Sequence, residues 1–193
     1  MIQTAFYAAP YGRYVMAAED GALTGVWLEG QKYFPSDLPE PSGEEPEIFT
    51  RTRRWLDAYF AGQQPEVSAL PLSPRGSDFA QSVWRLLLEI PYGQTVTYGQ
   101  LAKRLAEQRG LAHMSTQAVG GAVGHNPISI IIPCHRVVGT NGSLTGYAGG
   151  IEKKVKLLEL EQTDMTGFFA PKKGTALEGR ENNDRCGCDA KDD

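Results

Sequence analysis

A cysteine in the second half of the chain has neighbours that can make its thiol reactive. In the segment IIPCHRVVG (residues 131–139), an apolar run and a proline lead into Cys134, which is followed by His135 and Arg136. A cysteine that only fills a core is expected among apolar residues, whereas a basic neighbourhood lowers the thiol pKa and favours the nucleophilic thiolate. The motif therefore predicts a reactive cysteine.

The chain is long enough to position such a thiol inside a core. Its 193 residues are 41% hydrophobic and 22% charged, which is typical of a globular protein, and the length fits one domain or two small ones. We expect two small ones. No apolar run reaches the length of about 20 residues that spans a bilayer, and the start MIQTAFYAAP lacks the features of a signal peptide. We therefore expect a cytoplasmic protein with no membrane partner.

The first half predicts a small antiparallel sheet with one helix. Short apolar runs over residues 1–30 are separated by the turn sequences Pro10-Tyr11-Gly12 and Glu19-Asp20-Gly21, which predicts an antiparallel meander. A proline-rich acidic loop (34–47) follows, and then apolar residues recur at helical spacing from Ile48 to Phe60. Residues 63–76 are predicted to be a linker.

The second half predicts several short helices. A helix begins at Ser77-Asp78, Thr97 and Gln100 form a capping box before a helix to residue 108, and Ser115-Thr116 cap a short helix over 116–124. The last two helices resemble a helix-turn-helix with a long connection. A buried strand is predicted over 128–133, a glycine-rich loop over 139–150 and a final helix over 151–161.

The predicted fold class is therefore α+β. A small antiparallel-sheet-plus-helix N-terminal domain with its linker (1–76) precedes a mostly helical C-terminal domain (77–161) that carries a helix-turn-helix-like DNA-binding motif. Residues 162–193 lack an apolar period and are predicted to be a disordered tail. Cys186 and Cys188 in this tail are either an incidental pair or ligands of a soft metal, although two thiolates are too few for a closed site.

The charge of the second half and the small side chains of one of its helices are compatible with a surface that binds nucleic acid, but each also has another explanation. Residues 81–161 carry 8 basic and 5 acidic side chains, whereas residues 1–80 carry 6 and 11, which permits a basic surface on the second half but also fits plain solvation. The helix TQAVGGAVG (116–124) has almost no bulky side chains, and each glycine costs a helix interior roughly 1 kcal/mol. Either a neighbouring element or a ligand such as a nucleic-acid backbone must approach it closely.

Three blocks together identify a family resemblance. IPYGQTVTYGQLA (90–102), NPISIIIPCHRVVG (126–139) and GSLTGYAGG (142–150) closely resemble the O6-alkylguanine-DNA alkyltransferase family, the methylated-DNA-protein-cysteine methyltransferases. The match runs from about residue 79 to 161. The first half looks like the smaller ribonuclease H-like domain of that family.

The resemblance implies direct DNA repair by transfer of an alkyl group from guanine O6 to Cys134, once per molecule. His135 would take the thiol proton through a water, Glu161 would orient His135, Tyr98 would donate to the departing base, and Asn126 would brace the site. Arg136 would brace the domain. The implied base pocket is formed by Tyr98, Cys134, Val137, Tyr147, Ala148 and Gly149.

The resemblance also implies a partner, double-stranded DNA that contains an alkylated guanine. The target base would be flipped out of the stack, and the protein would contact the minor groove as a monomer. No cofactor is implied, and the zinc site of some family members has no counterpart, because the first half contains neither cysteine nor histidine. The implied DNA contacts are Thr97, Tyr98, Ser115, Thr116, Gln117, Ala118, Gly121 and Ala122.

Gln117 departs from the family pattern. Most members have an arginine at this position, which fills the gap left by the flipped nucleotide. Glutamine keeps a hydrogen-bonding end but loses the charge and the planar stacking surface. We expect flipping with a weaker affinity for duplex DNA.

Two other functions remain as alternatives. A sensor of alkylated bases would recognise lesions without repair, but in that group the cysteine is replaced. A hydrolase would use Cys134 and His135 with turnover, but no oxyanion-hole motif is evident. The range of alkyl groups accepted, and whether O4-alkylthymine is a substrate, stay open.

Overall fold

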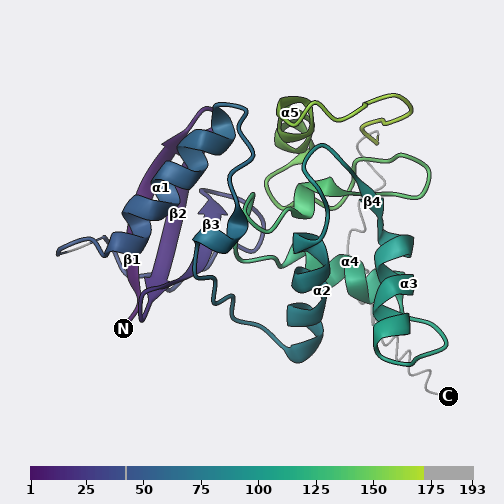
Figure 1. Cartoon of the computed structure of the whole chain (residues 1–193), viewed down its shortest axis with the longest axis horizontal. Helices are drawn as coiled ribbons and strands as arrows, with labels where there is room; N and C mark the ends of the chain where they lie inside the picture. Colours follow the sequence, from purple (N-terminus) through teal and green to yellow (C-terminus); the bar gives the residue numbers. More distant parts are fainter. Residues whose placement is uncertain (42, 172–193) are drawn as a thin grey trace, which may run out of the picture.

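The first half of the chain is a three-stranded sheet covered by a helix. A computed structural model describes residues 1–41 and 43–171. Strands β1 (Gln3–Ala9), β2 (Gly12–Glu19) and β3 (Ala22–Leu28) pair antiparallel in chain order, and α1 (Glu47–Phe60) packs across them (Figure 1). The predicted antiparallel meander is confirmed.

Local chemistry explains the elements of this half. The turn from β2 to β3 places Asp20 and Gly21 at φ 50° and 75°, the left-handed region that a two-residue hairpin requires. Helix α1 turns one apolar face toward the sheet and ends before Gly62, whose φ is 78°. The buried residues of this face are Ile48, Phe49, Thr52, Trp55, Leu56 and Tyr59.

The segment that was predicted to be a linker runs along the edge of the sheet. It contains a short 3-10 helix, η1 (Val67–Ala69), and then Leu72 forms a parallel bridge with Leu23 of β3. Leu23 donates to the Pro71 carbonyl and Ser73 donates to the Leu23 carbonyl, both at 2.8 Å. The connection is therefore held against the sheet of the first half of the chain.

The second half packs helices around two very short strands. Its helices are α2 (Asp78–Leu88), α3 (Tyr98–Gln108), α4 (Thr116–Gly124) and α5 (Ile151–Leu160), and β4 (Val96–Thr97) pairs parallel with β5 (Val137–Val138). Helices α2, α3 and α4 contact one another. The three predicted helix starts are confirmed, because the side chains of Ser77, Thr97 and Ser115 each accept a backbone N–H of the first turn.

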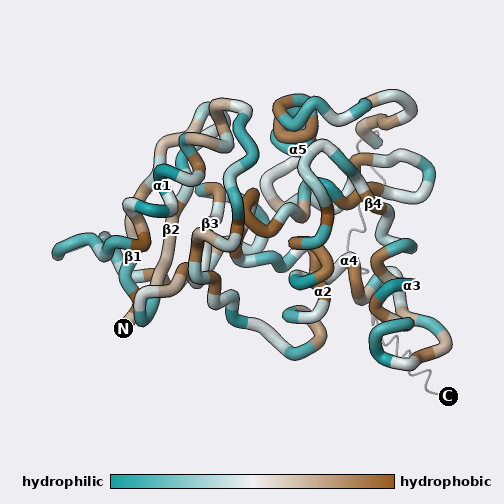
Figure 2. Tube along the Cα trace, in the orientation of Figure 1, coloured by the Kyte–Doolittle hydropathy of each residue, from teal (hydrophilic) through white to brown (hydrophobic). Residues whose placement is uncertain are grey.

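The two halves share one hydrophobic core. Buried residues from the sheet, α1, α2, α3, α4 and the segment before Cys134 form a single cluster. In Figure 2, brown hydrophobic stretches recur on α2, α3 and α4 and on the segment between these helices and the sheet. Val26 of β3 donates to the Pro127 carbonyl at 2.8 Å and accepts from Ser129 N–H at 2.9 Å, so the sheet edge holds the segment that leads to Cys134.

The predicted strand over 128–133 is wrong. Only Ile128 pairs, in a bridge with Val26, and the chain then turns with Ile130 at φ 71°, a rare conformation for a β-branched residue. Ile132 N–H donates to the Ile128 carbonyl at 3.0 Å, which closes the turn. A short apolar run predicts burial but does not distinguish a strand from a buried turn. Cys134 then begins a 3-10 turn, η2 (Cys134–Arg136).

The beginning of the predicted tail has a defined structure. Leu144 N–H donates to the Phe169 carbonyl at 2.9 Å, and Phe169 N–H donates to the Gly142 carbonyl at 3.1 Å. Met165 and Phe168 pack against a small second core of Val138, Leu144 and Leu158. The predicted disorder is therefore wrong for residues 162–171. The rest of that tail, with Cys186 and Cys188, lies outside the described residues. Within 1–41 and 43–171, no helix is both long and apolar enough to cross a membrane.

The substitution Trp84→Phe tests how α2 holds α4. The Trp84 Nε1–H donates to the Ala122 carbonyl of α4 at 2.9 Å in the buried core. Its loss leaves a buried carbonyl unpaired, so we expect the free energy of unfolding to fall by about 1–3 kcal/mol in urea denaturation. Trp55→Phe is the control, because Trp55 Nε1–H donates to the partly buried Glu66 carbonyl. An equal loss in both variants would contradict this account.

Candidate active site

Cys134 lies under the surface at the start of η2. It is 5% exposed, and the Asn126 side-chain amide donates to its Sγ at 3.1 Å. Burial raises the pKa of the Cys134 thiol, and the Asn126 hydrogen bond and the charge of Lys154 oppose this rise. The buried thiol is thus protonated at neutral pH and needs a base before it can react.

Asn126 holds the strained turn that precedes the thiol. Its Nδ2 also donates to the Ile132 carbonyl at 2.7 Å, and its Oδ1 accepts from Ile128 N–H at 3.0 Å. One side chain therefore joins both ends of the turn around Ile130 and the sulfur of Cys134. Backbone strain of this kind persists where the surroundings impose it, often at functional sites.

The next residue, His135, is paired with a buried carboxylate. His135 Nε2 lies 2.7 Å from Glu161 Oε1, and both side chains are fully buried. An ionised carboxylate only accepts hydrogen bonds, so we infer that Nε2 carries the proton and Nδ1 does not. His135 Nδ1 is buried and has no partner within the described residues. Burial lowers the pKa of His135, although Glu161 opposes this shift, so a neutral imidazole presents Nδ1 as a base.

The Glu161 carboxylate accepts hydrogen bonds from several elements. Arg136 donates from Nε to Oε2 at 2.8 Å and from Nη2 to Oε1 at 3.0 Å. Gly93 N–H donates to Oε2 at 3.1 Å, and the Tyr59 hydroxyl of α1 donates to Oε1 at 2.7 Å. Burial alone would raise the pKa of Glu161, but the hydrogen bonds from His135 and Arg136 and the charge of Arg136 together hold it well below the usual value. Glu161 is therefore ionised at neutral pH.

Gly93 must be a glycine for this geometry. Its φ is 73°, and a Cβ at this position would lie 2.8 Å from the Glu161 backbone oxygen. The turn Pro91-Tyr92-Gly93 thus brings a backbone donor onto the carboxylate because it has no side chain in the way. The Arg136 Nη1 also donates to the Ile90 carbonyl at 2.6 Å, so Arg136 fastens the same turn, in agreement with the bracing role expected for it.

Tyr98 and Tyr147, both predicted to line a base pocket, lie within electrostatic range of Cys134. The Tyr98 hydroxyl donates to the Thr145 carbonyl at 3.2 Å, and burial raises its pKa, so it remains protonated. The buried Lys154 of α5 donates to the carbonyls of Val137 and Thr145 at 2.5 and 2.7 Å. These contacts hold the loop that carries Tyr147, Ala148 and Gly149, all of which are half-buried.

The loop packs beside His135 in this arrangement. The Tyr147 ring lies edge-on to His135 at a centroid distance of 6.4 Å, and a Cβ on Gly149 would lie 2.8 Å from that ring. Lys32 of the first half of the chain donates its N–H to the Ala148 carbonyl at 3.2 Å. Both halves of the chain therefore hold the loop that lies beside His135.

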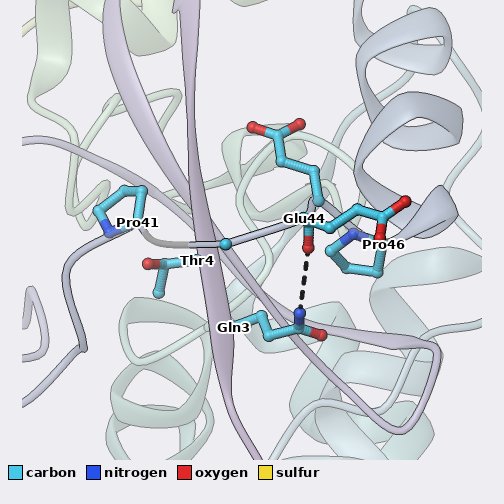
Figure 3. A pocket seen from close by; sticks show the side chains of 7 residues that line it. Gln3, Thr4, Pro41, Glu44 and Pro46 are labelled. Atoms are coloured by element: carbon cyan, nitrogen blue, oxygen red, sulfur yellow. Dashed lines mark hydrogen bonds between the residues drawn. The ribbon is translucent and has the colours of Figure 1, made fainter.

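Two surface hollows lie away from these residues. One of about 280 Å³ is formed by the start of β1 and the acidic loop, where the Gln3 amide donates to the Glu44 carbonyl at 3.4 Å (Figure 3). The other, of about 380 Å³, lies between α1 and the segment after it. Neither hollow contains a residue predicted for the chemistry.

The predicted DNA contacts are mostly exposed on α4. Thr97 is the half-buried cap of α3. Ala122 is 9% exposed and lies on the side of α4 that faces α2, so it does not join the others at the surface. The exposed residues of this set are Ser115, Thr116, Gln117, Ala118 and Gly121.

Aromatic rings lie beside two of the glycines of α4. A Cβ on Gly120 would lie 3.7 Å from the Tyr98 ring, and one on Gly124 would lie 3.8 Å from the Tyr33 ring. A Cβ on Gly121 would meet nothing within 4 Å. The rings at Gly120 and Gly124 thus lie at ordinary van der Waals distances that would still admit a methyl group, while Gly121 leaves open space at the surface.

Three residues of the site carry no signal that the sequence alone reveals. Tyr59 fits the apolar spacing that predicted a helix over residues 48–60, and Lys154 lies in a run of charged residues. Gly93 reads as an ordinary turn glycine. Only the tertiary arrangement brings these residues to Glu161 and to the loop beside His135.

The buried neutral imidazole predicts how stability depends on pH. Because the folded pKa of His135 lies below its ordinary value of about 6.5, the unfolded chain binds more protons between these two values. This contribution to stability is complete above about pH 6.5 and is lost as the pH falls, by up to about 1.4 kcal/mol per pH unit. Urea denaturation between pH 7.5 and 5.5 measures it.

The substitution His135→Gln should flatten this dependence. His113→Gln is the control, because His113 is exposed, and its pH dependence should match that of the unchanged protein. Equal slopes in all three proteins would show that the imidazole of His135 is not held neutral.

Comparison with known proteins gives one consistent result. A model of the 6-O-methylguanine DNA methyltransferase DNA binding domain matches residues 78–163, and a model of the ribonuclease-like domain of the same protein matches residues 2–74. The methylated-DNA–protein-cysteine methyltransferase of Haemophilus influenzae is 41% identical over 157 residues, which are 81% of this chain and 84% of that protein. The protein of the same name from Methanosarcina acetivorans is 42% identical over 158 residues, 81% and 96% of the two chains.

Solved structures agree with these sequence matches. The crystal structure of Mycobacterium tuberculosis O6-methylguanine methyltransferase has a TM-score of 0.70 at 41% identity and covers 84% of this chain and 93% of that one. A crystal structure of the M. tuberculosis protein in complex with DNA has the same TM-score and identity, with coverage of 83% and 92%. The chain therefore belongs to the 6-O-methylguanine DNA methyltransferase family.

Proposed function

We propose that this protein repairs O6-alkylguanine in DNA by moving the alkyl group to Cys134, once per molecule. The observation that carries the proposal is the geometry around the thiol. Cys134 is followed by a neutral histidine whose Nε2–H is held by Glu161 and whose Nδ1 is unpaired. In this arrangement Cys134 is the nucleophile, and the neighbouring His135 is the base that can activate it.

The first step removes the thiol proton. A water between Sγ of Cys134 and Nδ1 of His135 passes the proton to the imidazole, and Glu161 stabilises the charge that forms. The orphaned, buried Nδ1 supports a water at this point, because buried polar atoms are normally paired. The Asn126 amide and the Lys154 charge favour the thiolate as it forms.

The second step is an in-line displacement. The thiolate attacks the alkyl carbon, a C–S bond forms, and the C–O6 bond breaks with its electron pair left on the guanine. The Tyr98 hydroxyl donates a hydrogen bond to the base as this negative charge develops. The base then takes up a proton at N1 from solvent, His135 releases the thiol proton to solvent, and ordinary guanine is restored. The thioether is a poor leaving group, so the protein acts once.

The base must enter a covered site. A guanine inside a duplex is flipped out of its stack, and the loop that carries Tyr147, Ala148 and Gly149 moves to admit it. Backbone groups at Cys134 and Val137 then form hydrogen bonds with the edge of the guanine. The Tyr147 ring, which lies edge-on to His135 here, becomes the cover over the guanine.

The partner is double-stranded DNA, met through its minor groove by a monomer. Helices α3 and α4, joined by residues 109–115, act as a helix-turn-helix, and the exposed polar cap of α4 lies against the groove. The M. tuberculosis relative in complex with DNA supports this partner. Residues 1–76 and 77–161 form the two domains, and Thr97, Ser115, Thr116 and Ala118 contact sugar and phosphate.

The experiment is incubation with a duplex oligonucleotide that contains O6-methylguanine. Intact-mass analysis should show one added methyl group, on the peptide that contains Cys134, with saturation at one equivalent. Cys134→Ala should bind the duplex and leave the lesion in place. Turnover beyond one equivalent would indicate a hydrolase, and binding without a mass change would indicate a lesion sensor.

The substitution Gln117→Arg tests the gap-filling position. Gln117 is exposed in the first turn of α4, and arginine adds a charge and a planar stacking surface. We expect duplex affinity to increase by about five-fold, the effect of about 1 kcal/mol from one charge-assisted contact. Fluorescence anisotropy at a fixed salt concentration measures the affinity, and the repair rate should increase with it.

Gln63→Arg is the matched control for Gln117→Arg. It adds the same charge at an exposed position just after α1, far from α4 in the sequence. If both variants bind DNA equally well, general charge explains the gain and Gln117 does not occupy the gap.

A further inference from the structure

A hydroxyl group from the first half of the chain lies at the candidate active site in the second half. Tyr59 lies in the last turn of α1, is 1% exposed, and donates to Glu161 Oε1 at 2.7 Å. This oxygen is the one that accepts His135 Nε2–H, and the Tyr59 hydroxyl oxygen lies 3.4 Å from that nitrogen. The contact joins residues that are 102 positions apart in the chain.

The direction of this hydroxyl is set by the surrounding rings. The Tyr59 ring stacks on Trp55 at a centroid distance of 5.6 Å and an interplanar angle of 8°. Tyr92 packs against its edge at 6.1 Å and 75°. Burial and the charge of Glu161 raise the pKa of Tyr59 well above its ordinary value, so the hydroxyl is protonated and remains a donor at neutral pH.

We propose that Tyr59 is a positioning residue of the proton relay, which it controls by sharing Glu161 Oε1 with His135. This inference rests on the proposed function. Glu161 offers about four lone-pair sites to five donated hydrogen bonds, so the Tyr59 hydrogen bond weakens the hold of the carboxylate on Nε2–H. The shared acceptor keeps the imidazole neutral until the thiol proton arrives.

The other charged groups around His135 do not replace the effect of Tyr59 on the hydrogen bond between His135 and Glu161. The titratable and charged groups that face it belong to α1, η2, α5 and its C-cap, the turn after α2 and the loop after β5. Lys154 and Arg136 disfavour the imidazolium, whereas Glu161 favours it. Among these groups, Tyr59 is the one that donates to Glu161 from the first half of the chain. The full set is Cys134, Arg136, Lys154, Glu161, Tyr59, Tyr92 and Tyr147.

The test is the pH profile of single-turnover methyl transfer by the full chain with Tyr59→Phe. Without the hydroxyl, Glu161 holds the imidazolium more strongly, so the acid limb of the profile should move to higher pH by about half a unit to one unit. Below pH 7 the rate should fall by about three- to ten-fold. Tyr59→3-fluorotyrosine, a stronger donor, should move the limb in the opposite direction.

Tyr92→Phe is the matched control. It removes a hydroxyl from the same ring cluster, but that hydroxyl donates to the Leu160 carbonyl at 3.2 Å and not to Glu161. Its acid limb should stay in place. In a Glu161→Gln background, Tyr59→Phe should cause no further shift of the limb, because the shared carboxylate is gone.

The outcomes separate this inference from the proposed function. If the unchanged protein receives methyl groups on Cys134 but Tyr59→Phe and Tyr92→Phe give the same profile, Tyr59 has a structural role only and the inference is wrong. If the unchanged protein receives no methyl group, the proposed function fails and the inference fails with it.

Discussion

The carboxylate of Glu161 is the group on which the site depends. It is fully buried, yet five hydrogen bonds and the charge of Arg136 keep it ionised, and the donors come from three separate parts of the chain: α1, the turn at Gly93 and η2. An isolated buried charge would be costly, whereas a paired and hydrogen-bonded one can hold its neighbours in place. Through Glu161 the structure sets the tautomer of His135 and the position of the turn at Gly93.

A second constraint is the burial of the thiol. Cys134 follows a strained turn that Asn126 holds closed, and the edge of the N-terminal sheet supports this turn through Val26. Burial keeps the resting thiol protonated, so its reactivity depends on the neighbouring base and on the approach of a substrate. A protected nucleophile suits a protein that reacts once and is not regenerated, because side reactions would consume it.

Sequence reasoning predicted the sheet and the helix starts correctly and singled out Cys134 as a candidate, because these have local signals. The PCHR motif, the turn residues Asp20 and Gly21 and the caps Ser77, Thr97 and Ser115 all act over a few residues. It missed the turn at Ile130, since an apolar run predicts burial but not backbone direction. Tyr59 and Lys154 were also missed, because contacts between distant segments decide their roles.

The account depends most directly on which nitrogen of His135 carries the proton. Nitrogen-15 NMR of the imidazole at neutral pH, with His135 assigned by comparison with His135→Gln, measures this. The account predicts a neutral ring with the proton on Nε2 and a bare Nδ1. A proton on Nδ1, or a doubly protonated ring at neutral pH, would leave no base for the Cys134 proton and would contradict it.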